Sequence, residues 1–293
     1  MRAFSTFHPA SLFTYLTGAI LFSILTMNPV FTVASLLGGI LFYCLSGKQR
    51  EVAGNLMFYF CLFLLIAVFF PLFSHNGVTP LFFLNDRPVT YEAIRYGAAI
   101  SGTIIALFIW CNCYTLVMTS DKFVYLFGKI SPKLSLHFSM FLRFLPSMRA
   151  QYRHIKGTQK TLGLYSSKSV TDKIVGQIRI LSILLTWSFE NTVEVTASMK
   201  ARGYGLKGRR SYSIFRFHVQ DLVLFFVSLG LIITGIIFML SGKLNFWYYP
   251  AISSLPQDTY SILLYTLTAA FMLIPFIIEI KENITWKYLK SKI

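Results

Sequence analysis

Apolar residues gather in long runs that polar segments interrupt, and this pattern predicts helices that cross a membrane. Four runs occupy the first 118 residues and two follow near the C-terminus, at 11–27, 30–45, 52–73, 93–118, 222–240 and 262–280. A spanning helix needs about 20 apolar residues, so the first two runs are close to the lower limit. Asn28-Pro29 between them predicts a tight helical hairpin. A re-entrant or interfacial segment remains the alternative for one of the pair.

The region between the fourth and fifth runs has a different pattern, in which apolar residues alternate with charged ones and no run is long enough to span. It predicts two long helices. The first covers 134–164 and contains Pro146, which should bend the helix or restart it near Arg143. The second covers 172–201 and ends before Gly203. The chain is thus divided into transmembrane helices (1–119), a helical domain (120–218), and a transmembrane hairpin with a basic tail (219–293).

The composition agrees with a membrane protein. Hydrophobic residues make up 55% of the chain and charged residues only 13%, whereas about a quarter of the residues in soluble proteins are charged. We therefore predict an all-α integral membrane protein with about six transmembrane helices and two long cytoplasmic helices between spans four and five.

The formal net charge of +16 is distributed unevenly. Of the 27 Lys and Arg residues, 24 lie in the N-terminal segment, in the segment after the second run, in the middle domain or in the tail; the others are Arg87, Arg95 and Lys243. Because cytoplasmic loops retain positive charge, both termini and the middle domain are predicted to be cytoplasmic. Nucleic acid is a poor explanation, since the aromatic residues lie in apolar runs and not between basic residues.

No pattern for catalysis or metal binding is present in the sequence. The four cysteines lie inside apolar runs, without the spacing of a zinc site or a disulfide framework. The motifs G-x-x-x-x-G-K-[ST] and H-E-x-x-H are absent. These absences agree with a non-catalytic protein that binds no metal and no cofactor directly, which the resemblance described below implies.

The two middle helices carry charges at helical spacing. Four basic residues, which we name the basic stripe, share one face of the first helix: Arg149, Arg153, Lys156 and Lys160. A face toward lipid headgroups and a docking face for an acidic protein groove are equally good explanations. On the second helix, Glu190 and Glu194 lie one turn apart. Pairing with the basic stripe is favoured over a proton or cation site for these two carboxylates.

The second helix ends in the most distinctive stretch of the chain, residues 197–205, where Arg202 is followed by two glycines. An Arg at such a helix end can form bidentate contacts with carboxylates of a partner. Its alternative role is to compensate the dipole of its own helix.

Ala201-Arg202-Gly203 and Leu142-Arg143-Phe144-Leu145-Pro146 are each similar to a motif of one known family, at the end of its second coupling helix and at the beginning of its first. Other segments also fit that family: His8-Pro9, Asn28-Pro29, Asn76-Gly77-Val78-Thr79 and Thr90-Tyr91-Glu92-Ala93. The chain thus resembles, over almost its whole length, the transmembrane T component (EcfT/CbiQ type) of energy-coupling factor (ECF) transporters. One departure concerns the first coupling motif, which carries Ala-Arg-Gly in the family and reads Thr161-Leu162-Gly163 here. Either Lys160 or Arg153 provides the missing contact, or the contact is apolar.

The resemblance implies a coupling subunit of an ECF-type ABC importer in a bacterial or archaeal cell membrane. Two cytoplasmic ABC ATPase subunits would bind ATP, and a small membrane substrate-binding (S) component would select a vitamin or a transition metal. The implied ATPase-coupling residues are Ala201, Arg202, Gly203, Lys160, Leu162 and Gly163, supported by Arg149, Arg153 and Lys156 of the basic stripe.

Three other classes of protein fit the sequence less well. A self-contained secondary transporter or channel would use Glu190, Glu194 or Arg143 as intramembrane polar groups, but the six apolar runs contain almost no charge. A membrane-embedded enzyme would need a cluster of acids or histidines. An ordinary ABC permease has a short coupling helix instead of two long ones.

Overall fold

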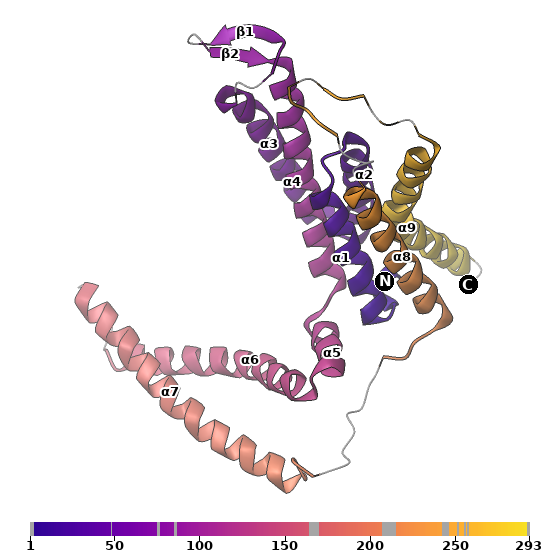
Figure 1. Ribbon diagram of the computed structural model, residues 1–293. Helices are drawn as coiled ribbons and strands as arrows, with labels where there is room; N and C mark the ends of the chain where they lie inside the picture. Colours follow the sequence, from indigo (N-terminus) through magenta and orange to yellow (C-terminus); the bar gives the residue numbers. More distant parts are fainter. Residues whose placement is uncertain are drawn as a thin grey trace. The chain divides into compact units, whose positions relative to one another are not determined.

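The computed structural model (Figure 1) describes residues 3–47, 49–74, 77–84, 87–163, 170–206, 215–241, 246–250, 252–254, 256 and 258–291. In chain order the elements are η1 (Phe4–Thr6), α1 (Pro9–Leu25), α2 (Pro29–Ser46), α3 (Gln49–Phe73), β1 (Pro80–Leu84), β2 (Arg87–Thr90), α4 (Tyr91–Val117), α5 (Ser120–Ile130), α6 (Pro132–Thr161), α7 (Val170–Ala201), α8 (Val219–Leu240) and α9 (Thr259–Ser291). The predicted all-α fold is confirmed, apart from the short antiparallel pair β1–β2. Asn76, part of one motif above, lies outside the described residues.

Five of the described helices, α2, α3, α4, α8 and α9, are long and apolar enough to cross a membrane. The sixth apolar helix, α1, is shorter at 17 residues. Each apolar run of the sequence therefore corresponds to one helix, and the chain is a multi-pass membrane protein. Neither α5 nor the β1–β2 hairpin is predicted by the apolar runs.

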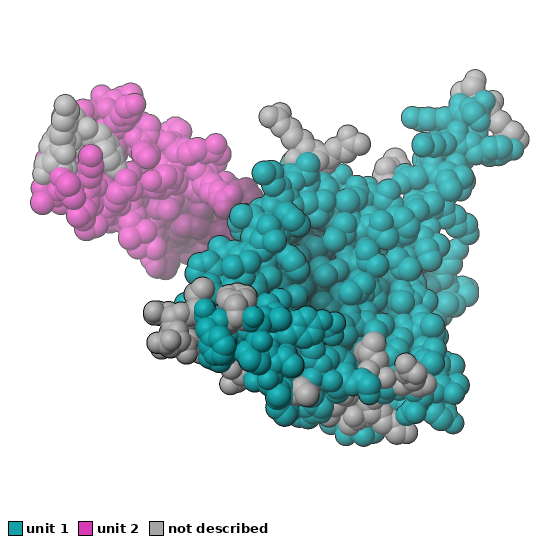
Figure 2. Space-filling view, turned by 90° about the horizontal axis from the view of Figure 1, so that it is seen from above, with its two compact units in different colours: residues 1–123, 215–293 teal, residues 124–214 magenta. Residues whose placement is uncertain are grey.

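The chain forms two compact units, coloured separately in Figure 2. The first comprises residues 1–123 and 215–293, and the second comprises residues 124–214. The apolar helices all belong to the first unit, whereas α6 and α7 belong to the second.

The first two apolar helices begin in the same way. Pro9 and Pro29 occupy the first turn, where the missing backbone N–H costs nothing. The side chain of the preceding residue caps each helix: His8 Nδ1 accepts from the N–H of Ala10 at 3.2 Å, and Asn28 accepts from the next-but-one N–H at 3.1 Å. Asn28 and Pro29 therefore begin α2 directly after α1, at the place where the sequence predicts the hairpin turn.

A buried aspartate joins the beginnings of α1 and α8. Asp221 is only 3% exposed, and its carboxylate accepts hydrogen bonds from the backbone N–H groups of His8 and His218, both at 2.8 Å. Its backbone carbonyl accepts from the hydroxyl of Ser11 at 2.8 Å. One carboxylate therefore satisfies N–H groups at two helix beginnings that are more than 200 residues apart in the chain.

Two further buried charges fix the N-terminal segment to the same unit. Glu279 of α9 accepts from the N–H of Phe4 at 3.1 Å. The ammonium group of Lys122 donates to the carbonyls of Ser5 and Val117. Desolvation by burial lowers the pKa of Lys122 below its ordinary value. The N-terminal segment, the end of α4 and the C-terminal part of α9 therefore lie at one end of the unit.

Aromatic residues mark the opposite end of the first unit. The hydroxyl of Tyr248 donates to the carbonyl of Met27, between α1 and α2, at 3.1 Å. The hydroxyls of Tyr249 and Ser74, just after α3, are 3.4 Å apart. Successive apolar helices thus run in alternating directions. Both points where the chain leaves for the second unit and returns from it lie at the end that holds Asp221 and Glu279.

The core of the first unit lies where α1, α2, α4, α8 and α9 meet, and Figure 1 shows α3 alongside α4 on the outer side. Pro275 inside α9 has no N–H, so the carbonyl of Phe271 loses its helical partner. The hydroxyl of Tyr15 donates to this carbonyl at 2.7 Å. Since no water is available in the membrane interior, this bond replaces the one that proline removes.

We expect Tyr15→Phe to lower the free energy of unfolding by about 1 to 2 kcal/mol, because the Phe271 carbonyl would then be buried without a partner. Thermal unfolding of the detergent-solubilised protein measures the effect. Tyr114→Phe is the matched control, since within the described residues no partner is recorded for the half-buried Tyr114 hydroxyl. Equal melting temperatures for the two variants would contradict this role of Tyr15.

The second unit is an antiparallel pair of long helices, α6 and α7, which cross in Figure 1. Their contact includes the buried Ile155, Ile180 and Leu184, together with the rings of Phe144 and Trp187, whose centroids are 5.8 Å apart. Helix α6 runs without interruption from Pro132 to Thr161 with Pro146 inside it. Of the two effects predicted for this proline, a bend or a restart near Arg143, the restart therefore does not occur.

Candidate functional site

Helix α7 ends in a glycine-based cap that holds Arg202 in position. Gly203 has a φ of +78°, in the left-handed region that residues with a side chain rarely adopt. Its N–H donates to the carbonyl of Lys200 at 2.9 Å, and the N–H of Tyr204 donates to the carbonyl of Met199 at 3.0 Å. This pair of bonds is the Schellman motif, and it places Arg202 at the C-cap position.

Helix α6 ends in a closely similar way. Gly163 has a φ of +74°, and its N–H donates to the carbonyl of Lys160 at 3.1 Å. Leu162 is therefore the C-cap residue of α6, as Arg202 is of α7. The correspondence between Leu162 and Arg202, which the sequence resemblance suggests, has a counterpart in the backbone geometry.

The cap residues of both helices are exposed. The side chain of Leu162 is 69% exposed, and those of Ala201 and Arg202 are also exposed. Each cap residue follows an exposed lysine by two positions, Lys160 in α6 and Lys200 in α7. The α6 end thus offers the apolar side chain of Leu162, and the α7 end offers the guanidinium of Arg202 with its five N–H donors. A lysine ammonium group accompanies each of them.

The two helix ends lie far apart within the second unit. The end of α6 lies near the beginning of α7, because the two helices are antiparallel and Ile155 packs against Ile180. Helix α7 then runs for 32 residues, which corresponds to about 48 Å at 1.5 Å per residue. The ends at Leu162 and Arg202 are therefore two separate places and cannot form one compact site.

The basic stripe runs beside the contact between α6 and α7. Arg149, Arg153, Lys156 and Lys160 are all exposed, whereas the side of α6 that faces α7 includes the buried Ile155. The ammonium group of Lys156 lies 5.8 Å from the centroid of the Tyr152 ring. The stripe is therefore an exposed surface of α6, which fits both a face toward lipid headgroups and a docking face for a partner.

The expected pairing of the stripe with Glu190 and Glu194 is wrong. Both carboxylates are exposed, and no ion pair within the described residues joins them to the stripe. The reason is the register of the two helices. Phe144 of α6 stacks on Trp187 of α7, and the two helices are antiparallel. Glu190 therefore lies opposite the part of α6 before Phe144. The stripe lies after Phe144, from Arg149 toward the C-terminal end of α6.

Sequence reasoning missed the buried charges Lys122, Asp221 and Glu279. Isolated acids at the edges of apolar runs are the signal that would have indicated them, since a charge in such a place needs a partner. Their partners are backbone groups of the N-terminal segment, which no side-chain motif encodes. Among the residues that the structure describes, no group of three potential ligands is able to hold a metal ion.

The six apolar helices and the long helical hairpin between the fourth and fifth define a multi-pass membrane protein with a large polar insertion. A family model described as cobalt transport protein (CbiQ) matches residues 8–212, which include both helix ends. The chain belongs to this family, the T-component family of ECF transporters, and is a membrane transport component that works with partner subunits. A comparison with curated proteins gives no match.

Proposed function

We propose that the chain is the coupling subunit of an ECF-type ABC importer. It transmits ATP hydrolysis by two cytoplasmic ABC ATPase subunits to a small membrane substrate-binding subunit, for the uptake of a transition metal or a vitamin. The chain itself catalyses no reaction, and ATP is bound by the ATPase partners. The observation that carries this proposal is the pair of similarly capped helix ends at Leu162 and Arg202.

The spacing of these ends suits two ATPase subunits better than one. Arg202 lies at the far end of α7, a helix about 48 Å long, whereas Leu162 ends α6 near the beginning of α7. The two ends can therefore each bind a different subunit of an ATPase pair. When the pair closes on ATP, both ends are displaced together. The helices then transmit the displacement as rigid bodies to the surface that holds the substrate-binding subunit.

The orientation of the chain follows from its charges. The N-terminal segment, the connections to the second unit and the C-terminal part of α9 lie at one end of the apolar helices. These segments, the segment after α2 and the middle domain that the connections enclose together contain 24 of the 27 Lys and Arg residues. We therefore place that end in the cytoplasm, where the ATPase subunits are.

Affinity purification of the tagged chain from mild-detergent membranes tests the proposal. We expect ABC ATPase subunits and a small membrane protein in the eluate, together with ATP hydrolysis, and the membrane partner then identifies the transported substrate. Recovery of the chain alone, stable and without hydrolysis, would contradict the proposal and would favour a transporter that works without an ATPase.

At the α6 end we expect the contact with an ATPase to be apolar. Burial of a leucine side chain contributes about 1.5 to 3 kcal/mol, so Leu162→Ser should weaken retention of the ATPase subunits about tenfold or more. Val193→Ser is the control, because Val193 on α7 is also 69% exposed but belongs to neither cap and lies far along α7 from the α6 end. If Leu162→Ser retains the subunits normally and Lys160→Gln does not, the contact is ionic and not apolar.

A further inference from the structure

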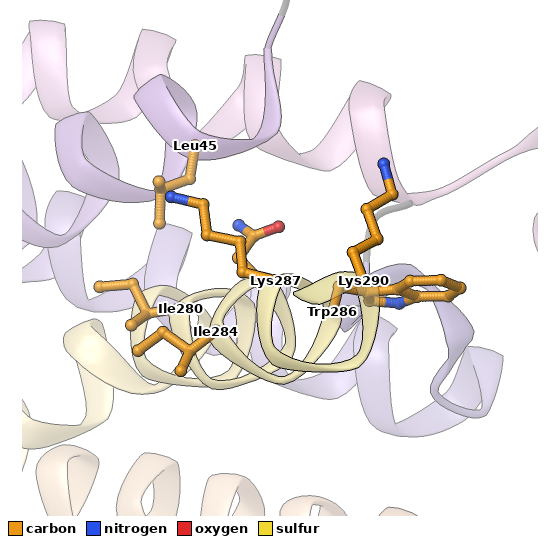
Figure 3. A pocket seen from close by; sticks show the side chains of 7 residues that line it. Leu45, Ile280, Ile284, Trp286, Lys287 and Lys290 are labelled. Carbon is orange, nitrogen blue, oxygen red and sulfur yellow. The ribbon is translucent and has the colours of Figure 1, made fainter. Parts of the chain in front are cut away.

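A groove of about 600 Å³ opens between the end of α2 and the C-terminal part of α9, both in the first unit (Figure 3). Leu45 contributes from the last turn of α2. All the other residues that line the groove belong to α9, and they change in character along the helix: Ile280 and Ile284 are followed by Trp286, Lys287 and Lys290. The groove is therefore apolar at one end and cationic at the other.

The position of the groove corresponds to the boundary between the membrane and water. Helix α9 has 33 residues and a length of about 50 Å, which exceeds the hydrocarbon thickness of about 30 Å. Its uninterrupted apolar sequence ends at Ile278, where Glu279 is the first charged residue, and further charged residues follow from Lys281. Trp and Lys residues are typical of this level of a membrane, where a ring or an aliphatic stem is buried and a polar group reaches the headgroups.

The two lysines form a cationic rim above the apolar part. Lys287 and Lys290 are three residues apart and extend from the same side of α9, with Lys287 reaching toward Leu45 (Figure 3). Within the described residues neither lysine has a carboxylate partner. Of the two acids on α9, Glu279 accepts from the backbone N–H of Phe4, and Glu282 is exposed and does not line the groove. The rim therefore keeps an uncompensated positive charge.

We propose that this groove binds an anionic glycerophospholipid. Its phosphate group lies between Lys287 and Lys290, and its acyl chain packs along Leu45, Ile280 and Ile284. A free phosphate ion would use only the lysines and leave the apolar part open to water. A zwitterionic lipid would fill the groove but bring a second cation close to the lysines. Of these three ligands, only an anionic lipid provides both a net negative headgroup for the lysines and an acyl chain for the apolar part.

Native mass spectrometry of the full chain, extracted from vesicles of equal parts phosphatidylglycerol and phosphatidylcholine, tests this inference. Wild-type protein should retain phosphatidylglycerol preferentially. Each lysine near an anionic surface contributes about a fivefold preference, so Lys287→Gln with Lys290→Gln should reduce the retained phosphatidylglycerol about tenfold or more. The matched control is Lys281→Gln with Arg216→Gln, which removes the same charge from exposed positions of the same unit outside the groove.

Three results with the wild type and the lysine variants would overturn the inference. The first is equal retention by the groove variant and the control variant, and the second is no preference for phosphatidylglycerol in the wild type. The third is displacement of the lipid by millimolar inorganic phosphate, because the lysines would then bind a free anion and the apolar part would contribute nothing. Leu45→Trp, which fills the groove and keeps both lysines, should also reduce retention, and unchanged retention would equally contradict an acyl chain at that place.

Discussion

Arg202→Glu is expected to reduce substrate uptake at least about a hundredfold while leaving the membrane unit folded. Removal of one partner from a buried, hydrogen-bonded ion pair costs about 2 to 5 kcal/mol, and reversal of the charge adds repulsion from the partner's carboxylates. The glycine cap involves backbone groups only, so the helix end itself should persist. The defect should therefore appear in the contact with an ATPase subunit and not in the fold of α7.

Uptake by cells and ATPase activity of the purified complex measure this effect together. Arg179→Glu is the matched control, because Arg179 is an exposed arginine in the middle of the same helix. Arg202→Lys should retain part of the activity, since an ammonium group keeps the charge but cannot form the bidentate contact. Normal uptake by Arg202→Glu would exclude Arg202 from the coupling contact.

The largest effect on stability is expected for Gly38→Ala, at the place where α2 crosses α9. A Cβ atom at Gly38 would lie 2.5 Å from the backbone carbonyl oxygen of Met272 and 2.9 Å from its carbonyl carbon. A change of side-chain rotamer cannot relieve a clash with backbone atoms, so the two helices would have to separate. Overpacking of this kind costs about 3 kcal/mol, which corresponds to a decrease in Tm of about 5 to 10 °C.

Thermal unfolding of the purified protein in detergent provides the comparison, with Gly230→Ala as the control. Gly230 also lies inside an apolar helix, α8, but a Cβ atom there would meet nothing within 4 Å. Both variants replace glycine by alanine inside a helix, so the change in helix propensity is the same. They differ only in that the new Cβ atom at position 38 clashes with α9. A Tm of Gly38→Ala equal to that of Gly230→Ala would show that α2 and α9 are not in such close contact.

The candidate site was predictable from the sequence to an unusual degree, because helix ends are local features. Gly163 and Gly203 each follow a long amphipathic pattern, and the left-handed conformation that ends each helix needs only the glycine and the carbonyls of the preceding turn. The exposure of Leu162 and Arg202 follows from their places at helix ends. The local sequence does not specify which residues of two distant segments face each other. The predicted pairing of Glu190 with the basic stripe is wrong for this reason.

The six apolar helices, their alternating directions and the two helix ends of the polar insertion can be derived from the order of residues alone. A helix in a membrane must satisfy its backbone hydrogen bonds within its own segment, so its limits are encoded locally. By contrast, the bond from the N–H of His8 to Asp221 and the close approach of α2 to α9 at Gly38 appear only in the folded chain. The same holds for the position of Glu190, which does not face the basic stripe. These relations depend on the fit of side chains from segments far apart in the chain, and no spacing along a single helix specifies that fit.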